Sequence, residues 1–379
     1  MRIAYFTDSL PPVSDGVTRA LTRLVETLPQ EGVEFRLFAA QRPEASLAWR
    51  ASVHRVNAIP LPLYPSYRIG LPIPGRMDAA LREFQPDLVH VVSPTPLGLY
   101  GMERARRLGI PVVGSFHSDW VSYMRFYGLG RWEKQVWRYV RWFYNRCHTT
   151  FAPSVSMADR LRENGIQRVG VWERGIDHHH FSPALRSESL RERAEAQNRP
   201  LLLYVGRIAK QKNLDDLADA VDLLRERLGP DAFRLAIVGE GPYTSELKQR
   251  MPHAHFAGYV RNSALSRWYA SADLFVFPST TETFGNVVLE AFASGVPVVG
   301  ADACGTKDLV EHGVNGLLAR PNDPADLAHH VASLLEDPAR RIAMGDAAET
   351  TALRYRWTDV NRRLLDSYRE LIGNAAVAA

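Results

Sequence analysis

The sequence predicts an α/β protein with two doubly wound parallel-sheet domains. The chain has 379 residues, and at roughly 150 residues per domain two domains are the natural expectation. Short apolar runs alternate with helical patterns in both halves of the chain, which is typical of parallel sheets covered by helices. A charged stretch with few apolar residues separates the two halves and indicates a linker. The expected segments are a first domain over 1–183, a linker over 184–199, a second domain over 200–355 and a C-terminal helix over 356–379 that packs back toward the first domain.

Composition argues against several classes of protein. The formal net charge of +4 is too small to suggest nucleic-acid binding by itself. The two cysteines, Cys147 and Cys304, make neither a disulfide framework nor a metal cluster, and they fit a reducing cytoplasm. The apolar run after Met1 is too short for a signal peptide, and no window approaches the roughly 20 apolar residues of a transmembrane helix. We therefore expect a cytoplasmic protein that is soluble or peripheral to a membrane.

The first domain begins with a strand over 2–7 and a loop from Asp8 to Val17, followed by a helix. A loop of small residues between strand and helix brings backbone amides close to a phosphate or a sugar, and Gly16 is the candidate contact. The segment over 61–75, rich in Pro and Tyr, is expected to be a loop. Further strands are expected over 34–40, 52–59, 86–93, 111–119, 149–153 and 168–172.

The strand over 111–119 ends in His117, Ser118 and Asp119. A single histidine at a strand end is more often structural than catalytic. Ligands of open parallel sheets, however, bind beyond the carboxyl ends of the strands, which makes His117 a candidate site residue. Three consecutive histidines at 178–180 point in different directions, and we interpret them as a surface loop rather than as metal ligands.

The helix expected over 131–145 has a basic face and an apolar face. Its basic residues recur at three- and four-residue spacing: Arg131, Lys134, Arg138 and Arg141. The apolar face is formed by Val136, Tyr139, Val140 and Phe143, and the basic residues are flanked by Trp137 and Trp142. One interpretation is a solvated basic face above a packed one. The alternative is a surface that rests on anionic lipid, with aromatic side chains at the interface.

The second domain begins with a strand over 201–205, and the loop that follows carries two cations, Arg207 and Lys212. Cations in a glycine-containing loop between strand and helix suit a diphosphate, and the helix amides add donors. Simple surface charge is the alternative. Further strands of this domain are expected over 234–238, 255–258, 274–277 and 296–300.

One helix of the second domain combines a mostly apolar composition with a polar stripe. It is expected to span about eleven residues, with Thr283 as its N-cap. The polar residues are Thr283, Asn286, Glu290 and Ser294, with Glu282 just ahead of the helix. A buried carboxylate is costly without a partner. The polar stripe is either one exposed edge of the helix or the wall of a ligand site. Cations that bind a diphosphate, Arg207 and Lys212, together with carboxylates that bind hydroxyl groups, would form a site for a nucleotide sugar.

Four stretches of the second domain form a recognisable set. They are Val205-Gly-Arg…Lys212, Val238-Gly-Glu-Gly-Pro242, Pro278-Ser…Glu282-Thr-Phe-Gly285 and Glu290-Ala-Phe-Ala-Ser-Gly295-Val-Pro297. Together they resemble the retaining glycosyltransferases of family 4, which have the GT-B fold. The resemblance covers nearly the whole chain. It implies a metal-independent hexosyltransferase whose two domains face a cleft, in keeping with a sequence that holds no Asp-x-Asp pair.

The resemblance also assigns roles to individual residues. It implies that Arg207 and Lys212 bind the diphosphate of the donor and stabilise charge on the leaving nucleotide. Glu290 is expected to hold the ribose, Gly16 to approach the diphosphate, and His117 to lie near the anomeric centre.

Contacts to the donor sugar and to the base follow from the same resemblance. Glu282 is expected to bind sugar hydroxyls, together with the backbone amides of Phe284, Gly285 and Asn286. The base is expected to contact Tyr259, Val260 and Arg261. The loop over 303–308 departs from the family pattern, because Cys304 and Lys307 stand where the family often has glycine and proline.

Two subgroups of the family look most similar. One transfers mannose from GDP-mannose to lipid-linked or glycolipid acceptors, and we favour it. The other transfers glucose or sulfoquinovose from UDP-sugars to diacylglycerol. In either case the basic helix favours an anionic membrane surface as partner, at the inner face of the plasma membrane. Different classes remain open: a phosphorylase of the same fold, or a non-catalytic GT-B partner subunit.

Overall fold

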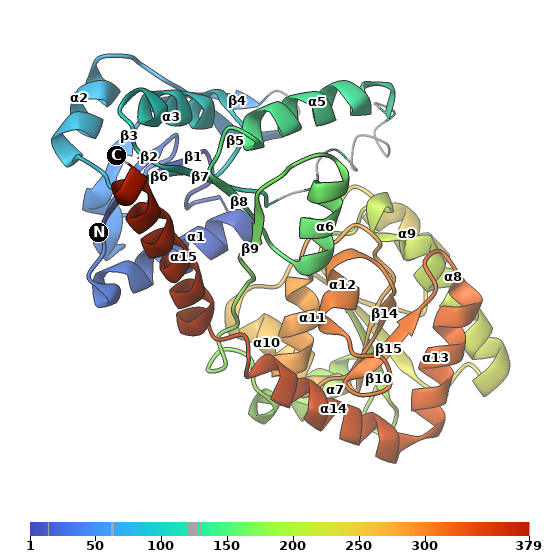
Figure 1. The fold of residues 1–379 in the computed structure, drawn as a ribbon. Helices are drawn as coiled ribbons and strands as arrows, with labels where there is room; N and C mark the ends of the chain where they lie inside the picture. Colours follow the sequence, from blue (N-terminus) through green and yellow to red (C-terminus); the bar gives the residue numbers. More distant parts are fainter. Residues whose placement is uncertain are drawn as a thin grey trace. The chain divides into compact units, whose positions relative to one another are not determined.

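The computed structural model describes residues 1–13, 15–61, 64–117, 119, 121, 128 and 130–378. These residues form two compact units, whose course through the sequence is coloured in Figure 1. Unit 1 consists of Met1–Gly175 and Trp357–Ala379, and unit 2 is Ile176–Arg356. Ser14 and Ser118, which the sequence analysis assigns to the first loop and to a strand end, lie outside the described residues.

The described residues of unit 1 form a seven-stranded parallel sheet in the order β3-β2-β1-β6-β7-β8-β9. Its strands are β1 (Arg2–Thr7), β2 (Glu34–Ala39), β3 (Val53–Arg55), β6 (Leu88–Val91), β7 (Val112–Ser115), β8 (Thr149–Ala152) and β9 (Val169–Val171). The chain runs outward from β1 to β3 and then returns to β6 on the other side of β1. Open parallel sheets bind ligands at such a change of direction.

Helices cover both faces of this sheet. Alternate residues of β1 point to opposite faces and therefore enter two different cores. Ile3 and Tyr5 lie in one core with α1 and α15, whereas Ala4 and Phe6 lie in another with α2, α3, α5 and α6. The helices are α1 (Gly16–Thr27), α2 (Arg76–Phe84), α3 (Pro96–Arg107), α5 (Glu133–Tyr144), α6 (Val155–Glu163) and α15 (Trp357–Ala378).

The segment expected to be a loop over 61–75 instead contributes to an antiparallel hairpin of β4 (Asn57–Leu61) and β5 (Tyr64–Leu71). Its prolines suggested a loop. Pro65, however, lies in β5 of a sheet with only two strands, where the missing amide donor is tolerated. The amide of Gly70 donates to Asp8 Oδ1 at 2.6 Å, which ties the hairpin to the loop after β1.

The described residues of unit 2 form a six-stranded parallel sheet in the order β12-β11-β10-β13-β14-β15. Its strands are β10 (Leu201–Val205), β11 (Arg234–Val238), β12 (His255–Gly258), β13 (Leu274–Phe277), β14 (Val298–Ala301) and β15 (Gly316–Ala319). The chain changes direction between β10 and β13, which lie next to each other. The prediction of two doubly wound parallel sheets is confirmed.

The helices of unit 2 pack around one continuous core. They are α7 (Glu188–Arg193), α8 (Leu214–Leu228), α9 (Thr244–Arg250), α10 (Asn262–Ser271), α11 (Asn286–Ala293), α12 (Cys304–Leu309), α13 (Pro324–Glu336) and α14 (Pro338–Ala352).

Residues 184–199, expected to be a linker, form part of unit 2, and the chain passes between the units at Gly175 instead. Helix α7 packs on α10 and contributes Leu190 to the core. The charge of this segment suggested a solvated linker. Arg191, however, is buried, where it pairs with Asp273 (Nη1 to Oδ2, 2.8 Å) and donates to backbone carbonyls. A paired and hydrogen-bonded arginine is compatible with burial.

Helix α11 begins at Asn286 rather than near Thr283, and it is shorter than expected. Its N-cap is Gly285, which has a left-handed backbone with φ of 93°, and no side chain caps the helix. A Cβ atom on Gly305 would lie 2.4 Å from the backbone of Phe284, so the loop ahead of the helix is packed closely against α12. This contact and the glycine cap delay the start of the helix.

The C-terminal helix α15 is part of unit 1 and runs beside α1 (Figure 1). Its buried side chains are Val360, Leu364, Leu365 and Tyr368. The amide group of Asn361 donates to the carbonyl of Arg23 and to the hydroxyl of Thr27, both at 3.2 Å. Unit 1 is therefore built from two segments that lie far apart in the sequence.

Glycines allow the loops after the first strands of unit 2 to touch backbone to backbone. Gly239 has φ of 139°, and a Cβ atom on it would lie 2.0 Å from the carbonyl oxygen of Gly206. A Cβ atom on Gly241 would lie 2.2 Å from the carbonyl oxygen of Ile208. The amide of Ile208 also donates to the backbone carbonyl of Glu240 at 3.1 Å. The loops after β10 and β11 thus form one rigid layer.

We expect Gly239→Ala to destabilise unit 2 by about 3 kcal/mol, because it combines backbone strain with a clash against another backbone. Thermal unfolding followed by circular dichroism should show a midpoint roughly 9 °C lower. Gly313→Ala is the matched control, since Gly313 has φ of 86° but no atom within 4 Å of the added methyl. Equal losses in the two variants would contradict the proposed backbone contact.

Candidate functional site

The loops after β10 and β13 meet where the sheet of unit 2 changes direction, and they carry charged residues of the predicted site. Lys212 ends the short 3₁₀ helix Lys210–Lys212, and its ammonium group pairs with the carboxylate of Glu282. The two side chains are only 14% and 20% exposed. Arg207 lies on the same loop as Lys212 and is exposed. The predicted cations and one predicted carboxylate therefore lie at one edge of one sheet.

Hydrogen bonds hold these loops in register. The hydroxyl of Thr281 donates to the carbonyl of Gln211 at 3.0 Å, which links the loop after β13 to the loop after β10. The amide of Gly305 donates to the carbonyl of Glu282 at 3.1 Å, which adds the segment after β14. Glu282 is therefore positioned by its backbone as well as by its ion pair.

Glu290 lies within α11 and is only 3% exposed. The hydroxyl of Tyr269, from α10, donates to its Oε2 atom at 2.9 Å, and Tyr269 is itself fully buried. A hydrogen bond of this kind stabilises a carboxylate in an apolar interior. The polar stripe predicted on this helix is therefore largely buried, because Ser294 is buried as well.

Ser279 directly follows Pro278 at the end of β13. Its side chain is fully buried, and its hydroxyl has no hydrogen-bond partner among the described residues. Buried hydroxyl groups almost always have a partner. The unpaired hydroxyl therefore marks a buried position at this sheet edge that a water molecule would satisfy.

The first turn of α11 offers backbone donors. Because no side chain caps the helix after Gly285, its first amides remain available to an anion or a hydroxyl. Asn286 is the first helical residue, and Phe284 directly precedes the glycine cap. These are the amides that the sequence analysis assigns to the donor sugar.

The segment that is expected to contact the nucleobase of the donor follows β12. The amide of Tyr259 donates to Glu240 Oε1 at 3.3 Å, which joins this segment to the loop after β11. The ring of Tyr259 is 53% exposed, and the guanidinium group of Arg261 lies 4.8 Å from its centre. Val260 between them is half-buried. An exposed aromatic ring at a sheet edge offers a stacking surface.

In unit 1, His117 lies two residues beyond β7, and both of its ring nitrogens are engaged. Its Nε2 atom lies 2.8 Å from the hydroxyl of Ser115, and its Nδ1 atom lies 2.8 Å from Arg174 Nη2. Burial, then the charge of Arg174 and then His90 lower the pKa of His117 well below its usual value. Burial lowers the pKa of Arg174 to about 9, so the arginine is charged and His117 is neutral at neutral pH.

Gly16 is the first residue of α1 and is exposed. Asp15 caps the helix by accepting the amide of Thr18 at 2.6 Å. Asp8, earlier in the same loop, is buried and accepts the hydroxyl of Thr95 from the segment after β6. Burial raises the pKa of Asp8, and its hydrogen bonds to Thr95 and Gly70 oppose that rise. These contacts shape the loop between β1 and α1.

The basic stripe is exposed on α5 and the turn before it: Arg131, Lys134, Arg138 and Arg141 are all exposed. The aromatic residues differ from expectation. Trp137 is buried in the core, while Tyr139 lies outside at 36% exposure beside Trp142 at 39%. The sequence pattern misassigned these two because positions 137 and 139 both lie near the boundary between the faces of the helix. Trp132, 48% exposed, adds a third outward aromatic ring.

The structure groups the predicted residues by unit. In unit 2 they lie on the loops after β10, β12 and β13 and on α11: Arg207, Lys212, Tyr259, Val260, Arg261, Glu282, Phe284, Gly285, Asn286 and Glu290. In unit 1, Gly16 and His117 follow β1 and β7, which are separated by β6.

Sequence reasoning did not assign roles to Tyr269, Ser279 and Arg174. Tyr269 and Arg174 are partners of predicted residues, and nothing in their local sequence indicates this. Ser279 had a usable signal, since a small polar residue directly after a buried strand lies at the carboxyl edge of the sheet.

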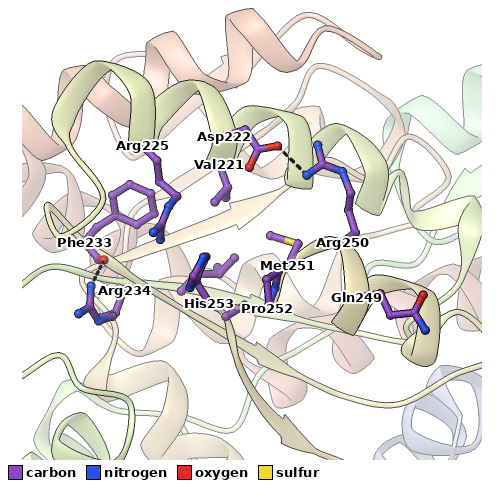
Figure 2. A pocket seen from close by; sticks show the side chains of 12 residues that line it. Val221, Asp222, Arg225, Phe233, Arg234, Gln249, Arg250, Met251, Pro252 and His253 are labelled. Atoms are coloured by element: carbon purple, nitrogen blue, oxygen red, sulfur yellow. Dashed lines mark hydrogen bonds and ion pairs between the residues drawn. The ribbon is translucent and has the colours of Figure 1, made fainter.

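A hollow of about 320 Å³ opens near the start of β11, at the opposite end of the strands from these loops. Figure 2 shows its lining, which includes Arg225 of α8, Arg234 of β11 and His253. Arg250 is paired there with Asp222 (Nη1 to Oδ2, 2.6 Å). This hollow contains none of the predicted site residues.

Two searches of the described residues bear on the remaining expectations. None of their helices has the length and apolar character needed to cross a membrane. The same residues contain no group of three or more His, Cys, Asp or Glu side chains arranged to hold a metal ion.

Known proteins are similar to this chain in sequence and in fold. A family model described as Glycosyltransferase Family 4 matches residues 14–180, and one described as Glycosyl transferases group 1 matches residues 199–337. A GDP-mannose-dependent alpha-mannosyltransferase of Mycolicibacterium smegmatis is 36% identical over 100% of both chains. The sulfoquinovosyl transferase SQD2 of Arabidopsis thaliana is 31% identical over 94% of this chain and 71% of its own.

Among solved structures, HepE of Anabaena in complex with UDP has a TM-score of 0.79 at 21% identity, covering 98% of this chain and 100% of that one. This likeness concerns the fold, and it agrees with the two parallel sheets. The matches over the full length lead to one conclusion: the chain belongs to the family-4 glycosyltransferases, which are retaining enzymes of the GT-B fold.

Proposed function

We propose that this enzyme transfers mannose from GDP-mannose to a lipid-linked or glycolipid acceptor with retention of the anomeric configuration. The observation that carries the proposal is similarity over the full length of the chain. Three relatives named GDP-mannose-dependent alpha-mannosyltransferase are 33–36% identical over 98–100% of this chain. The acceptor class rests on the subgroup resemblance and on the basic helix, and no acceptor is identified.

The ion pair of Lys212 and Glu282 supplies two ligand contacts in this proposal. The ammonium group of Lys212 turns to the donor diphosphate together with Arg207, and the carboxylate of Glu282 binds sugar hydroxyls. Each charge is already held at the sheet edge by the other, so donor binding exchanges one charged partner for another instead of exposing an unpaired charge. Cations fixed near the leaving nucleotide stabilise the charge that develops on it.

The buried carboxylate of Glu290 is proposed to accept the ribose hydroxyls, with Tyr269 fixing its second oxygen. The amides at the start of α11 add donors for the sugar. His117 is proposed to orient the same sugar. Both of its ring nitrogens are already engaged, so its contribution is orientation rather than proton transfer.

Two other functions are distinguished by specific observations. Transfer from a UDP-sugar to diacylglycerol is favoured by the 31% identity to SQD2 over 94% of this chain. A non-catalytic partner subunit is disfavoured, since the chain retains Arg207, Lys212 and Glu290 with Lys212 and Glu290 held by partners.

We expect GDP-mannose, among GDP- and UDP-sugars, to raise the unfolding midpoint most and to be the donor that is hydrolysed slowly without acceptor.

Lys212→Met should lower kcat/KM by about 100-fold, because loss of one charged group that stabilises the transition state costs roughly 3 kcal/mol in the barrier. Glu290→Gln should mainly raise the KM for the donor, by about tenfold, since a ribose contact is the same in ground and transition states.

Lys210→Met is the matched control for this experiment, because Lys210 is an exposed lysine of the same loop and contacts Tyr243 instead of the site. It should change kcat/KM by less than about twofold. Preference for UDP-glucose or UDP-sulfoquinovose would replace the proposed donor. A β-linked mannoside as product, identified by NMR, would be incompatible with retention.

The basic stripe on α5 is proposed to rest on an anionic lipid surface. Four exposed cations lie beside the outward rings of Trp132, Tyr139 and Trp142, a combination suited to the headgroup region. This would hold the enzyme at the inner face of the plasma membrane, where a lipid-linked acceptor is found.

We expect the protein to sediment with phosphatidylglycerol vesicles at low ionic strength and to remain free with phosphatidylcholine vesicles. Arg138→Glu should weaken vesicle binding roughly thirtyfold, since reversing one charge removes about 2 kcal/mol of attraction. Arg82→Glu, an equal charge reversal at an exposed position of α2, should have little effect. Unchanged binding in Arg138→Glu would rule out α5 as the contact surface.

A further inference from the structure

A continuous line of buried polar side chains runs through unit 1 from the C-terminal helix to His117. The Tyr368 hydroxyl lies 2.6 Å from His90 Nδ1, and His90 Nε2 lies 2.8 Å from Ser115 Oγ. The Ser115 hydroxyl lies 2.8 Å from His117 Nε2, and His117 Nδ1 lies 2.8 Å from Arg174 Nη2. Tyr368, His90, Ser115 and Arg174 are each at most 4% exposed. Of these residues, only His117 has a role in the family resemblance and in the proposed function.

Arg174, at one end of this line, determines which group donates and which accepts in each hydrogen bond. A guanidinium group only donates hydrogen bonds, so His117 Nδ1 must accept from Arg174. Arg174 cannot turn away, because its other terminal nitrogen donates to the carbonyls of Trp172 (2.7 Å) and Glu173 (3.0 Å). Neutral His117 therefore carries its proton on Nε2 and donates it to Ser115 Oγ.

Ser115 determines the tautomer of His90 in turn. Because its oxygen already accepts from His117, its own proton points to His90 Nε2, the one further acceptor that the described residues place within hydrogen-bond distance of this hydroxyl. His90 must then carry its proton on Nδ1 and donate it to Tyr368. The reverse assignment would aim two N–H groups at Ser115 and leave the serine proton without an acceptor. Two histidines joined through one serine thus hold opposite tautomers.

The line ends at Tyr5. The Tyr368 hydroxyl, having accepted from His90, needs an acceptor for its own proton. The buried Tyr5 hydroxyl is its neighbour, and that hydroxyl has no hydrogen-bond partner of ordinary geometry among the described residues. Burial, and then the neighbouring Tyr5, raise the pKa of Tyr368, and burial lowers the pKa of His90 to about 3. All members except Arg174 are therefore uncharged at neutral pH, as a buried network requires.

We infer that Tyr368, His90 and Ser115 are positioning residues, through which the C-terminal helix holds His117 in the Nε2–H tautomer with its ring fixed against Arg174. The inference rests on the proposed function only in that His117 serves the transferred sugar. It makes α15 part of the machinery of the site rather than a structural appendage.

The wild-type protein tests the tautomers without any substrate. Two-bond ¹H–¹⁵N correlation spectra of the full chain, labelled at its 12 histidines, distinguish protonated from unprotonated ring nitrogens. His90→Gln and His117→Gln identify the two residues by loss of their signals. We expect His117 protonated on Nε2 and His90 protonated on Nδ1. The same tautomer in both residues, or a charged ring in either, would overturn the inference.

A double-mutant cycle tests the connection to the reaction. We expect kcat to fall about tenfold in Ser115→Ala and about threefold in Tyr368→Phe, with the KM of the donor unchanged, as buried hydrogen bonds of ordinary strength are lost. In Ser115→Ala/Tyr368→Phe the second change should have no further effect, because the line is already interrupted. Tyr100→Phe, which removes a hydroxyl bonded to Asp78 outside the line, should leave kcat unchanged.

Multiplying effects on kcat in the double variant would mean that Tyr368 acts independently of Ser115, and the inference would fail. Thermal unfolding of each variant separates loss of fold from loss of positioning. If GDP-mannose proves not to be the donor while the two tautomers are as expected, the proposed function fails and the hydrogen-bond line stands.

Discussion

The ion pair between Lys212 and Glu282 organises unit 2 around the point where its sheet changes direction. These residues lie 70 positions apart in the chain and meet because β10 and β13 are neighbours. The pair fixes the spacing of two loops, and with it the positions of Arg207 and of the uncapped start of α11. Close contact of glycine backbones also joins the loop after β10 to the loop after β11. Charge pairing and backbone contact thus act together to prepare one edge of one sheet.

The sequence predicted the strand ends well and the long-range partners poorly. Arg207, Lys212 and Glu282 could be placed at one sheet edge because each follows an apolar strand, and parallel strands end at a common edge. Their roles, and that of Glu290, were implied by the family resemblance. The segment over 184–199 was misinterpreted since the burial of an arginine depends on a carboxylate 82 positions away. The start of α11 was misplaced because a contact with α12 decides it. Local pattern carries no information about such partners.

The two units use polar groups in opposite ways. Unit 2 presents charges at its sheet edge, where solvent and ligand can reach them. Unit 1 buries a line of neutral groups whose single charge, Arg174, is anchored by backbone carbonyls. An interior of low polarity tolerates that line because the donors from Arg174 to His90 each have an acceptor. Charged residues suit binding of a diphosphate, whereas a network of neutral, hydrogen-bonded side chains suits the rigid orientation of a single ring.

The discontinuity of unit 1 has a consequence for the order of events during synthesis. Unit 2 is one continuous segment and is complete once Arg356 has been made, whereas the first 175 residues must wait for α15. Until Tyr368 leaves the ribosome, His90 has no partner for its Nδ1 proton, and the hydrophobic face shared by α1 and β1 lacks its cover. Domains often mature in the order in which they are translated. Here the half of the enzyme that is made first is finished last, and a chain interrupted before α15 would expose this defect to proteolysis.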